Sequence, residues 1–124
     1  MVKTKVIIAG SRDFYDYDLL AEECNIILEG KDDIEVVSGR AIGADMLGEM
    51  YAKDKKYPVK LFPADWNTHG KGAGFIRNGE MAKYANMLIA FWDGESKGTK
   101  HMVETAQKKG MEVYVIDIYK NLID

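Results

Sequence analysis

The chain has 124 residues, of which 47 % are hydrophobic and 30 % are charged, a composition typical of one globular domain with a core of its own. Its net charge is −3, so nothing indicates the basic stripe of an electrostatic nucleic-acid binder, and we expect no nucleic acid as partner. The single cysteine, Cys24, excludes an intrachain disulfide and is expected to be a buried, inert thiol. No apolar run approaches the roughly 20 residues that cross a bilayer, so we expect no membrane partner and a cytoplasmic location.

Apolar, β-branched runs alternate with segments of helical periodicity along the chain. Predicted strands cover residues 5–9, 34–38, 57–63, 86–92 and 112–116. Predicted helices cover residues 16–29, 43–55, 73–84 and 99–109, and the tail to Asp124 is expected to be a short helix or to fray. Strands that alternate with helices predict a single α/β domain over residues 1–124. Its three layers would be a parallel sheet of about five strands with helices on both faces.

The stretch 35–45 is the most informative segment, because a strand, a glycine-bearing loop and a helix start follow one another directly. Gly39 and Gly43 would let an anion approach the backbone at the helix N-terminus, where N–H groups are unpaired. The Ser38 hydroxyl could donate a hydrogen bond to the anion, and the Arg40 guanidinium could bind it in a bidentate manner. Asp45 could cap the helix or accept a hydrogen bond from a ribose hydroxyl. Alternatively, the glycines merely turn the chain, Asp45 only caps the helix and Arg40 is solvated.

Three further loops follow predicted strands, at residues 10–14, 64–74 and 93–99, and we expect all four loops to meet at one edge of the sheet. Glycine backbone, hydroxyls and arginines at this edge suit a phosphate joined to a sugar and a base. Trp66 could stack on the base or fill the core, which is the commoner fate of an isolated tryptophan. Few metal-binding side chains occur, so we expect no metal and no cofactor. The candidate ligand-binding residues are Gly10, Ser11, Arg12, Ser38, Gly39, Arg40, Gly43, Asp45, Trp66, Arg77, Asn78, Ser96, Gly98 and Thr99.

Five short motifs occur in a characteristic order along the chain. They are Gly10-Ser11-Arg12, Ser38-Gly39-x-Ala41-x-Gly43-Ala44-Asp45, Pro63-Ala64-Asp65-Trp66, Arg77-Asn78-x-x-Met81 and Ser96-x-Gly98-Thr99. With these motifs the chain resembles the SLOG superfamily of nucleotide-binding domains, and within it the YspA-related branch of small bacterial and phage proteins. The resemblance implies a Rossmann-like fold and a small nucleotide-like ligand, and it is compatible with a homodimer.

The chain is also similar, more distantly, to the lonely-guy phosphoribohydrolases, which cleave the N-glycosidic bond of nucleoside monophosphates. Arg77 matches the arginine of their Arg-Lys-x-x-Met motif, and Gly98-Thr99 matches their glycine-threonine pair. Met102, however, occupies the position of their motif glutamate. Bond cleavage needs a carboxylate near the anomeric carbon, which Asp45, Asp65, Asp93 or Glu95 could supply.

Three functions are therefore considered. The first is a module that binds or senses a nucleotide or nucleotide derivative at the carboxyl edge of the sheet. The second is a nucleotide N-glycosidase, a hydrolase in which Arg77 and Asp45 are the candidate catalytic residues. The third is a protein-interaction module in which the nucleotide site is vestigial.

Overall fold

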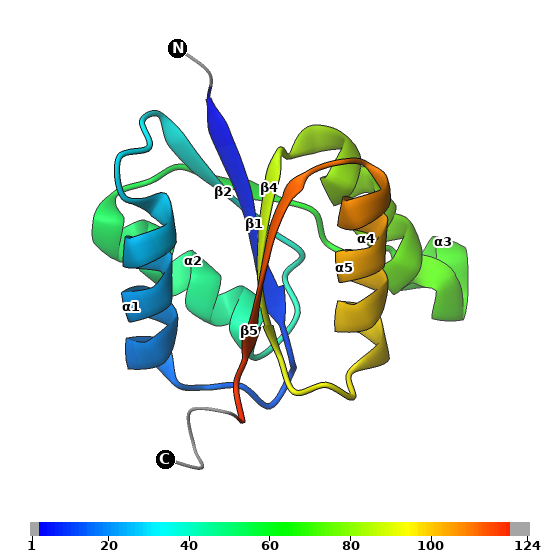
Figure 1. Cartoon of the computed structure of the whole chain (residues 1–124). Helices are drawn as coiled ribbons and strands as arrows, with labels where there is room; N and C mark the ends of the chain where they lie inside the picture. The colour runs from blue at the N-terminus through cyan, green and yellow to red at the C-terminus, as the bar shows by residue number, and fades with distance from the viewer. Residues whose placement is uncertain (1–2, 120–124) are drawn as a thin grey trace.

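Five parallel strands form the central layer of the computed structural model, which describes residues 3–119 (Figure 1). They are β1 (Thr4–Gly10), β2 (Ile34–Ser38), β3 (Val59–Leu61), β4 (Met87–Trp92) and β5 (Glu112–Asp117). Their order across the sheet is β3-β2-β1-β4-β5, and every neighbouring pair is parallel. The chain thus builds outward from β1 to β3 and then returns past β1 to add β4 and β5. The topological switch point lies between β1 and β4.

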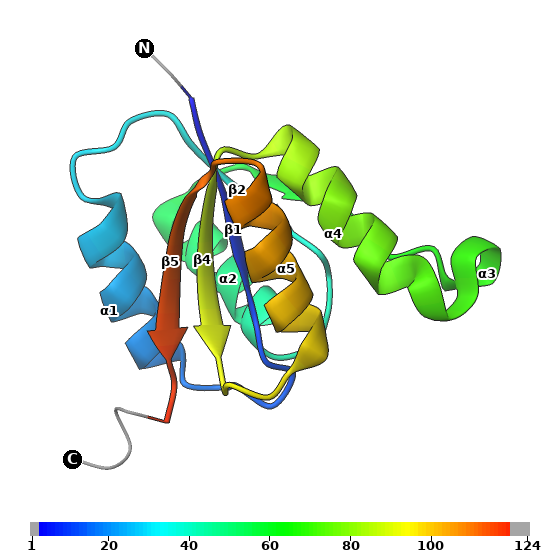
Figure 2. The same ribbon diagram turned by 45° about the vertical axis from the view of Figure 1, so that its right-hand side comes forward.

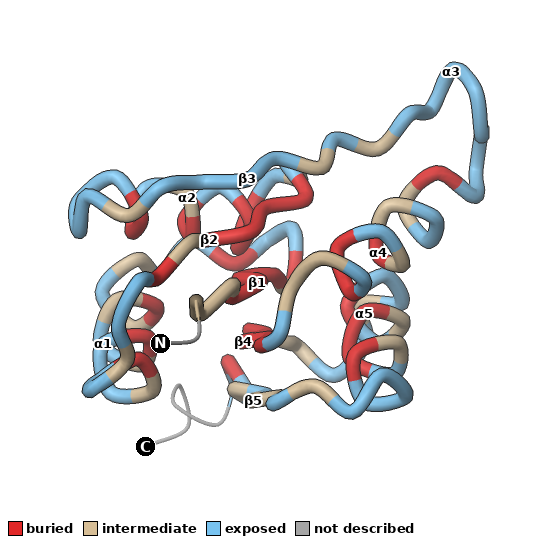
Figure 3. Tube along the Cα trace, turned by 90° about the horizontal axis from the view of Figure 1, so that it is seen from above, coloured by how far each residue is buried: buried red, intermediate tan, exposed pale blue. Residues whose placement is uncertain are grey.

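Helices cover both faces of this sheet (Figures 1 and 2). One face carries α1 (Tyr17–Leu28) and α2 (Ala44–Lys55), and the other carries α4 (Ala73–Tyr84) and α5 (Lys97–Lys108). The short helix α3 (Trp66–His69) and the 3-10 turn η1 (Gly70–Gly72) lead into α4. Figure 2 shows α3 projecting away from the sheet, and Figure 3 shows that it is exposed along its length.

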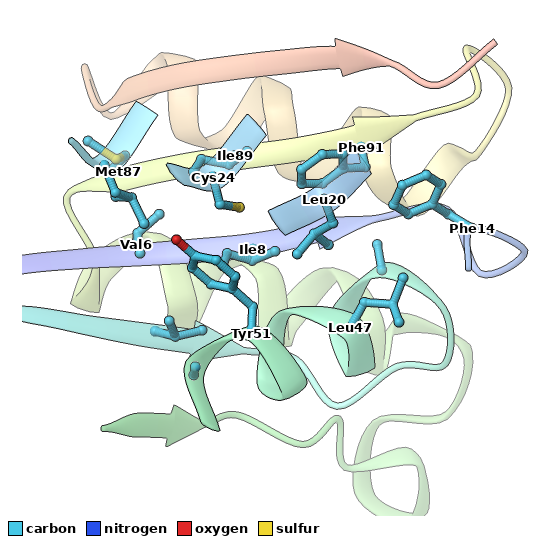
Figure 4. Packing of buried hydrophobic residues seen from close by; sticks show 14 of the residues in the cluster. Val6, Ile8, Phe14, Leu20, Cys24, Leu47, Tyr51, Met87, Ile89 and Phe91 are labelled. Atoms are coloured by element: carbon cyan, nitrogen blue, oxygen red, sulfur yellow. The ribbon is translucent and has the colours of Figure 1, made fainter. Parts of the chain in front are cut away.

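Two apolar clusters hold the layers together. Alternate residues of β1 point to opposite faces, so Val6 and Ile8 join the cluster under α1 and α2, whereas Ile7 and Ala9 join the cluster under α4 and α5. Figure 4 shows the first cluster, in which Tyr51 of α2 lies beside Ile8. A strand covered on both faces needs apolar residues at consecutive positions, which explains the unbroken apolar runs of β1 and β4.

The predicted fold class is confirmed, because the structure is a three-layer α/β domain with a five-stranded parallel sheet over residues 3–119. Cys24 is fully buried, as expected, and burial raises the pKa of its thiol to about 12. No helix within residues 3–119 combines the length and the apolar character that a bilayer span requires. The tail to Asp124, predicted as a short helix or a frayed end, extends beyond the described residues from residue 120 onward.

Three parts of the chain differ from the prediction by more than one residue, each for a local reason. β3 spans only Val59–Leu61, because it is an edge strand flanked by Pro58 and Pro63, which cannot donate to a ladder. The predicted loop 64–74 contains α3 and η1, which are too short to show helical periodicity. α5 begins two residues before the predicted start, because Ser96 caps it and accepts a hydrogen bond from Thr99 N.

Candidate functional site

A pocket of about 280 Å³ opens at the carboxyl edge of the sheet, beside the switch point. Its wall combines the end of β1, the start of α2, the inner side of α4 and the first turn of α5. The lining residues are Ala9, Gly10, Arg12, Ala41, Asp45, Arg77, Asn78, Met81, Ser96, Lys97, Gly98, Thr99 and Met102. This space is called the edge pocket below.

The loop after β1 is packed tightly beneath the start of α2. A side chain at Gly10 would overlap the carbonyl of Phe91, and one at Gly43, whose φ is +80°, would overlap the carbonyls of Ser11 and Arg12. Ser11 is buried, and its Oγ accepts a hydrogen bond of 3.1 Å from Asp93 N. Gly43 and Ser11 therefore join neighbouring loops and do not line the edge pocket.

The loop after β2 is tied to α2 through Glu49. Ser38 is buried, donates from its Oγ to Glu49 Oε2 at 2.6 Å, and accepts from Arg40 N at 3.1 Å. The Arg40 guanidinium forms an ion pair with the same carboxylate. Ser38 thus has an internal role, and the charge of Arg40 is partly balanced within the protein.

Arg77 and Asn78 on α4 connect this loop to the start of α5. Arg77 Nη1 donates to the carbonyl of Gly39, and Arg77 Nε donates to Asn78 Oδ1 at 3.0 Å. Asn78 Nδ2 in turn donates to the carbonyl of Gly98 at 3.3 Å and lies 3.1 Å from His101 Nδ1. Three segments that are distant in sequence are therefore held around one pocket by two adjacent side chains.

Asp45 lies at the floor of the edge pocket with only 4 % of its surface exposed. Its Oδ2 accepts from Ala41 N at 3.3 Å. Burial raises the pKa of this carboxyl to about 6, although the nearby Arg77 guanidinium lowers it. The pKa of Arg77 is lowered by burial, raised by Asp45 and lowered by the like charge of Arg12. A guanidinium nevertheless stays protonated at neutral pH, so the pocket retains its cations.

The first turn of α5 closes one end of the edge pocket. Ser96 and Thr99 hydroxyls lie 3.0 Å apart, and Asp93 Oδ1 accepts from the amides of Glu95 and Ser96 at 2.8 Å each. The first-turn amides of an α-helix have no partner within the helix, and they favour an anion. Lys97 and Gly98 from this turn line the pocket, so the backbone dipoles and the lysine both favour a negatively charged ligand there.

A second pocket of about 310 Å³ adjoins the first. It is lined by Arg12, Gly39, Arg40, Ala41, Ile42, Pro63, Ala64, Trp66 and Arg77, and it is called the tryptophan pocket below. Trp66 has 52 % of its surface exposed, so the alternative that it fills the core is wrong. The reason is that α3 stands clear of the sheet, where no apolar layer can cover the indole (Figure 3).

The predicted site residues therefore divide into three groups. The edge pocket brings together Gly10, Arg12, Asp45, Arg77, Asn78, Ser96, Gly98 and Thr99. The tryptophan pocket brings together Gly39, Arg40 and Trp66, and it shares Arg12 and Arg77 with the edge pocket. Ser11, Ser38 and Gly43 line neither pocket.

The list of candidate ligand-binding residues missed four apolar lining residues of the edge pocket, Ala9, Ala41, Met81 and Met102. Both methionines are buried, and their apolar positions on the helices are typical of packing residues. The one available signal was the place of Met102 in the Gly-Thr motif, where the phosphoribohydrolases carry a glutamate. That position does line the pocket, but here it offers a thioether instead of a carboxylate.

Comparisons with known proteins show similarity to a phage protein in sequence and to DNA processing proteins in structure. The Gene 61 protein of Mycobacterium phage D29 is 39 % identical over 119 residues, covering 88 % of this chain and 93 % of that protein. DNA processing protein A (DprA) from Streptococcus pneumoniae superposes with a TM-score of 0.72 at 18 % identity, over 91 % of this chain and 50 % of that one. DprA from Helicobacter pylori superposes with a TM-score of 0.63 at 21 % identity, over 97 % of this chain and 71 % of that one. The chain thus spans half the length of the pneumococcal protein.

These comparisons correct one expectation. The Helicobacter pylori structure concerns a unique single-stranded DNA binding mode of that protein. The expectation that nucleic acid is not a partner is therefore wrong, because it relied on the net charge of −3 for the whole chain. A net charge is a sum over the entire surface, whereas binding depends on the local charge at the site. Here Arg12, Arg77 and Lys97 gather at one pocket.

The family follows from the sequence matches. A model of the YspA, cpYpsA-related SLOG family matches residues 4–69, a segment that contains the loops after β1, β2 and β3. The phage relative extends the match over most of the chain. This chain belongs to the YspA, cpYpsA-related SLOG family.

Proposed function

We propose that this protein binds a nucleotide unit in the edge pocket, either as a free nucleotide or as part of a single strand of nucleic acid. The phosphate would lie between Arg77, Arg12 and the first turn of α5. A ribose hydroxyl would donate to Asp45 at the pocket floor. Bound in this way, the ligand would join the same loops that meet at the switch point, where α/β proteins of this type hold their ligands.

The observation that carries the proposal is the charge of the pocket wall. Among the described residues that line the edge pocket, Arg12, Arg77 and Lys97 are cationic and only Asp45 is acidic. Arg12 is close enough to Arg77 to lower its pKa, and within residues 3–119 no hydrogen bond or ion pair holds the Arg12 guanidinium. Two guanidinium groups around one cavity repel each other until an anion lies between them.

The comparisons support the same class of ligand. The SLOG family and the fold shared with DprA are consistent with a nucleotide or a nucleic-acid strand. We extend the single-stranded DNA binding of the Helicobacter pylori protein to this chain only as part of the proposal.

A second candidate, hydrolysis of a nucleotide N-glycosidic bond, is favoured by Asp45. Its carboxyl is buried beside Arg77, and its pKa of about 6 is suited to a general acid or base near neutral pH. Against this candidate, Met102 and Met81 occupy the rest of the apolar wall and add no second carboxyl. Release of free base from nucleoside monophosphates, measured by chromatography and abolished in Asp45→Asn, would establish hydrolysis.

Calorimetric titration of the protein with thymidine monophosphate and with an oligothymidylate tests the binding proposal. Arg77→Ala should weaken both ligands by about tenfold or more, since a charge-assisted hydrogen bond is lost. Lys83→Ala is the matched control, because Lys83 also belongs to α4 but lines a separate pocket at the opposite end of the helix. Equal affinities for the wild type and Arg77→Ala would contradict the proposal, and a flat response to every ligand would favour the protein-interaction module.

A further inference from the structure

The edge pocket and the tryptophan pocket are two compartments of one surface. Arg12, Ala41 and Arg77 line both of them. A ligand bound to the guanidinium of Arg77 in the edge pocket therefore has an open neighbouring space of similar size, about 310 Å³ beside about 280 Å³. Each compartment alone is near the lower end of the size range of small-molecule sites, roughly 300–1,000 Å³.

The two compartments differ in chemistry. The edge pocket presents hydroxyls, helix amides, a lysine and a carboxylate, which suit a phosphate and a sugar. The tryptophan pocket presents the indole of Trp66 together with Ile42, Pro63 and Ala64. Trp66 and Ile42 are both more than half exposed, so this apolar wall is open to solvent. A flat aromatic ring beside cations suits a nucleobase and its phosphate.

Gly74 brings the indole and the guanidinium to one place. A methyl group added at Gly74 would lie 3.7 Å from Trp66 Cη2 and 3.6 Å from Arg77 Nη2, so both side chains flank the same point of the α4 backbone. Asp65 caps α3 by accepting from Thr68 N at 3.1 Å, which orders the backbone of the short helix that begins at Trp66. The indole therefore lies close to the Arg77 guanidinium, beside the cationic wall of the edge pocket.

Each compartment has its own cations. Lys97 belongs only to the edge pocket and Arg40 only to the tryptophan pocket, while Arg12 and Arg77 stand between them. The Arg40 charge is shared with Glu49, which leaves part of its guanidinium exposed toward the second compartment. Cations in two adjoining compartments, with an aromatic side chain in one of them, suit the alternating phosphates and bases of a nucleic-acid strand.

We infer that the ligand is a single strand of nucleic acid that occupies both compartments, with one nucleotide in the edge pocket and the base of the neighbouring nucleotide stacked on Trp66. This inference rests on the proposed function of the edge pocket and adds the length of the ligand and the residue that recognises its base. A free mononucleotide fills one compartment only. Stacking on Trp66 then distinguishes a strand from a mononucleotide.

The test compares thymidine monophosphate with single strands of DNA and RNA of about 12 nucleotides, a length within the usual site size for such proteins. Trp66→Ala should weaken the strand by about tenfold and leave the monophosphate unchanged, because one base–aromatic stack is lost. Trp66→Phe should retain most of the affinity for the strand. Phe75→Ala is the matched control, since Phe75 is similarly exposed but stacks on His101 and lines neither compartment.

Tryptophan fluorescence supplies a second readout that does not depend on affinity. The chain has two tryptophans, and Trp92 is held by a hydrogen bond from its Nε1 to the carbonyl of Ser96. Strand binding should quench the wild type, and the quenching should disappear in Trp66→Phe, which keeps Trp92. The ratio of DNA to RNA affinity then identifies the kind of strand.

The failure of this inference differs from the failure of the proposed function. If Arg77→Ala weakens every ligand but Trp66→Ala changes none, the strand inference is overturned while the edge pocket stands. If Trp66→Ala weakens the monophosphate as much as the strand, a single nucleotide spans both compartments and the inference is again overturned. If neither the monophosphate nor the strand binds to the wild type, the proposed function itself fails.

Discussion

Asp45 and Arg77 approach the same side of Gly39. A methyl group added at Gly39 would lie 2.9 Å from Asp45 Oδ2 and 2.6 Å from Arg77 Nη1, closer than side-chain carbons come to other atoms. Asp45 belongs to the first turn of α2 and Arg77 to α4. The missing side chain at Gly39 therefore allows residues from two helices on opposite faces of the sheet to share a site. The Asp45 carboxylate and the Arg77 guanidinium both line the edge pocket.

The first prediction concerns the pH dependence of stability. The pKa of Asp45 is raised to about 6 in the folded protein, above the ordinary value of 3.8, so the folded state binds more protons than the unfolded state between these values. Stability contributed by this group is therefore present at low pH and is lost as the pH rises through about 6. Between pH 8 and pH 5, the wild type should gain roughly 1.4 kcal/mol relative to Asp45→Asn.

Chemical denaturation of both proteins at several pH values measures this difference. Asp32→Asn is the control, since Asp32 is exposed in the turn before β2. Parallel pH profiles for the wild type and Asp45→Asn would contradict the raised pKa of Asp45.

The second prediction separates binding from folding at Gly39. Gly39→Ala should weaken nucleotide binding by about tenfold, because the new methyl group displaces the Arg77 guanidinium from the pocket wall. The fold should survive, since the atoms in conflict are the ends of side chains that can rotate away. Calorimetry measures the affinity, and Gly79→Ala is the control, because a methyl group at Gly79 on α4 meets no atom within 4 Å. Unchanged affinity in Gly39→Ala would show that the position of Arg77 is unimportant.

The third prediction concerns the packing of the loop after β1 against α2. Gly43→Ala should cost at least about 2 kcal/mol of unfolding free energy, because φ is +80° and the methyl group would overlap two backbone carbonyls. Gly98→Ala should fold normally, since nothing lies within 4 Å of its added methyl group. Thermal and urea unfolding distinguish the two variants, and equal midpoints would contradict the packing described for Gly43.

The fourth prediction concerns the charge on Arg40. Glu49→Gln keeps an acceptor for the Ser38 hydroxyl but removes the carboxylate that pairs with Arg40. Single-stranded oligonucleotides should then bind more tightly, with a steeper dependence on salt, because an additional cation becomes available to phosphate. Glu22→Gln on the exposed side of α1 makes the same change in net charge away from both pockets. Equal salt dependence in the two variants would rule out a role for Arg40 beside the strand.

The sequence predicted the sheet and the convergence of its loops, because both follow from general rules. Unbroken apolar runs such as Val6–Ala9 require a strand covered on both faces, and parallel strands place all their carboxyl ends at one edge. The joint presence of Arg77, Gly98 and Thr99 in one pocket follows from this topology together with the motifs.

Other features depend on pairings that a sequence does not reveal. Arg40 and Glu49 are nine positions apart, and their ion pair depends on the left-handed backbone of Arg40, whose φ is +65°. The exposure of Trp66 depends on how far α3 stands from the sheet (Figure 2). Met102 lines the pocket together with Ala9 and Gly10 of β1. Helical periodicity alone identifies Met102 only as a packing residue. Such details are set by tertiary contacts that local patterns do not specify.

Mapping amide chemical shifts by NMR during a titration with an oligothymidylate locates the ligand on the protein surface. The largest changes should occur at the amides of Ala41, Gly98 and Thr99, which line the edge pocket, and at the indole of Trp66. Amides at the opposite edge of the sheet, such as those of Lys31 and Gly110, should remain unchanged. Changes confined to the opposite edge, or no changes at ligand concentrations that saturate binding, would contradict a nucleotide site at the carboxyl edge.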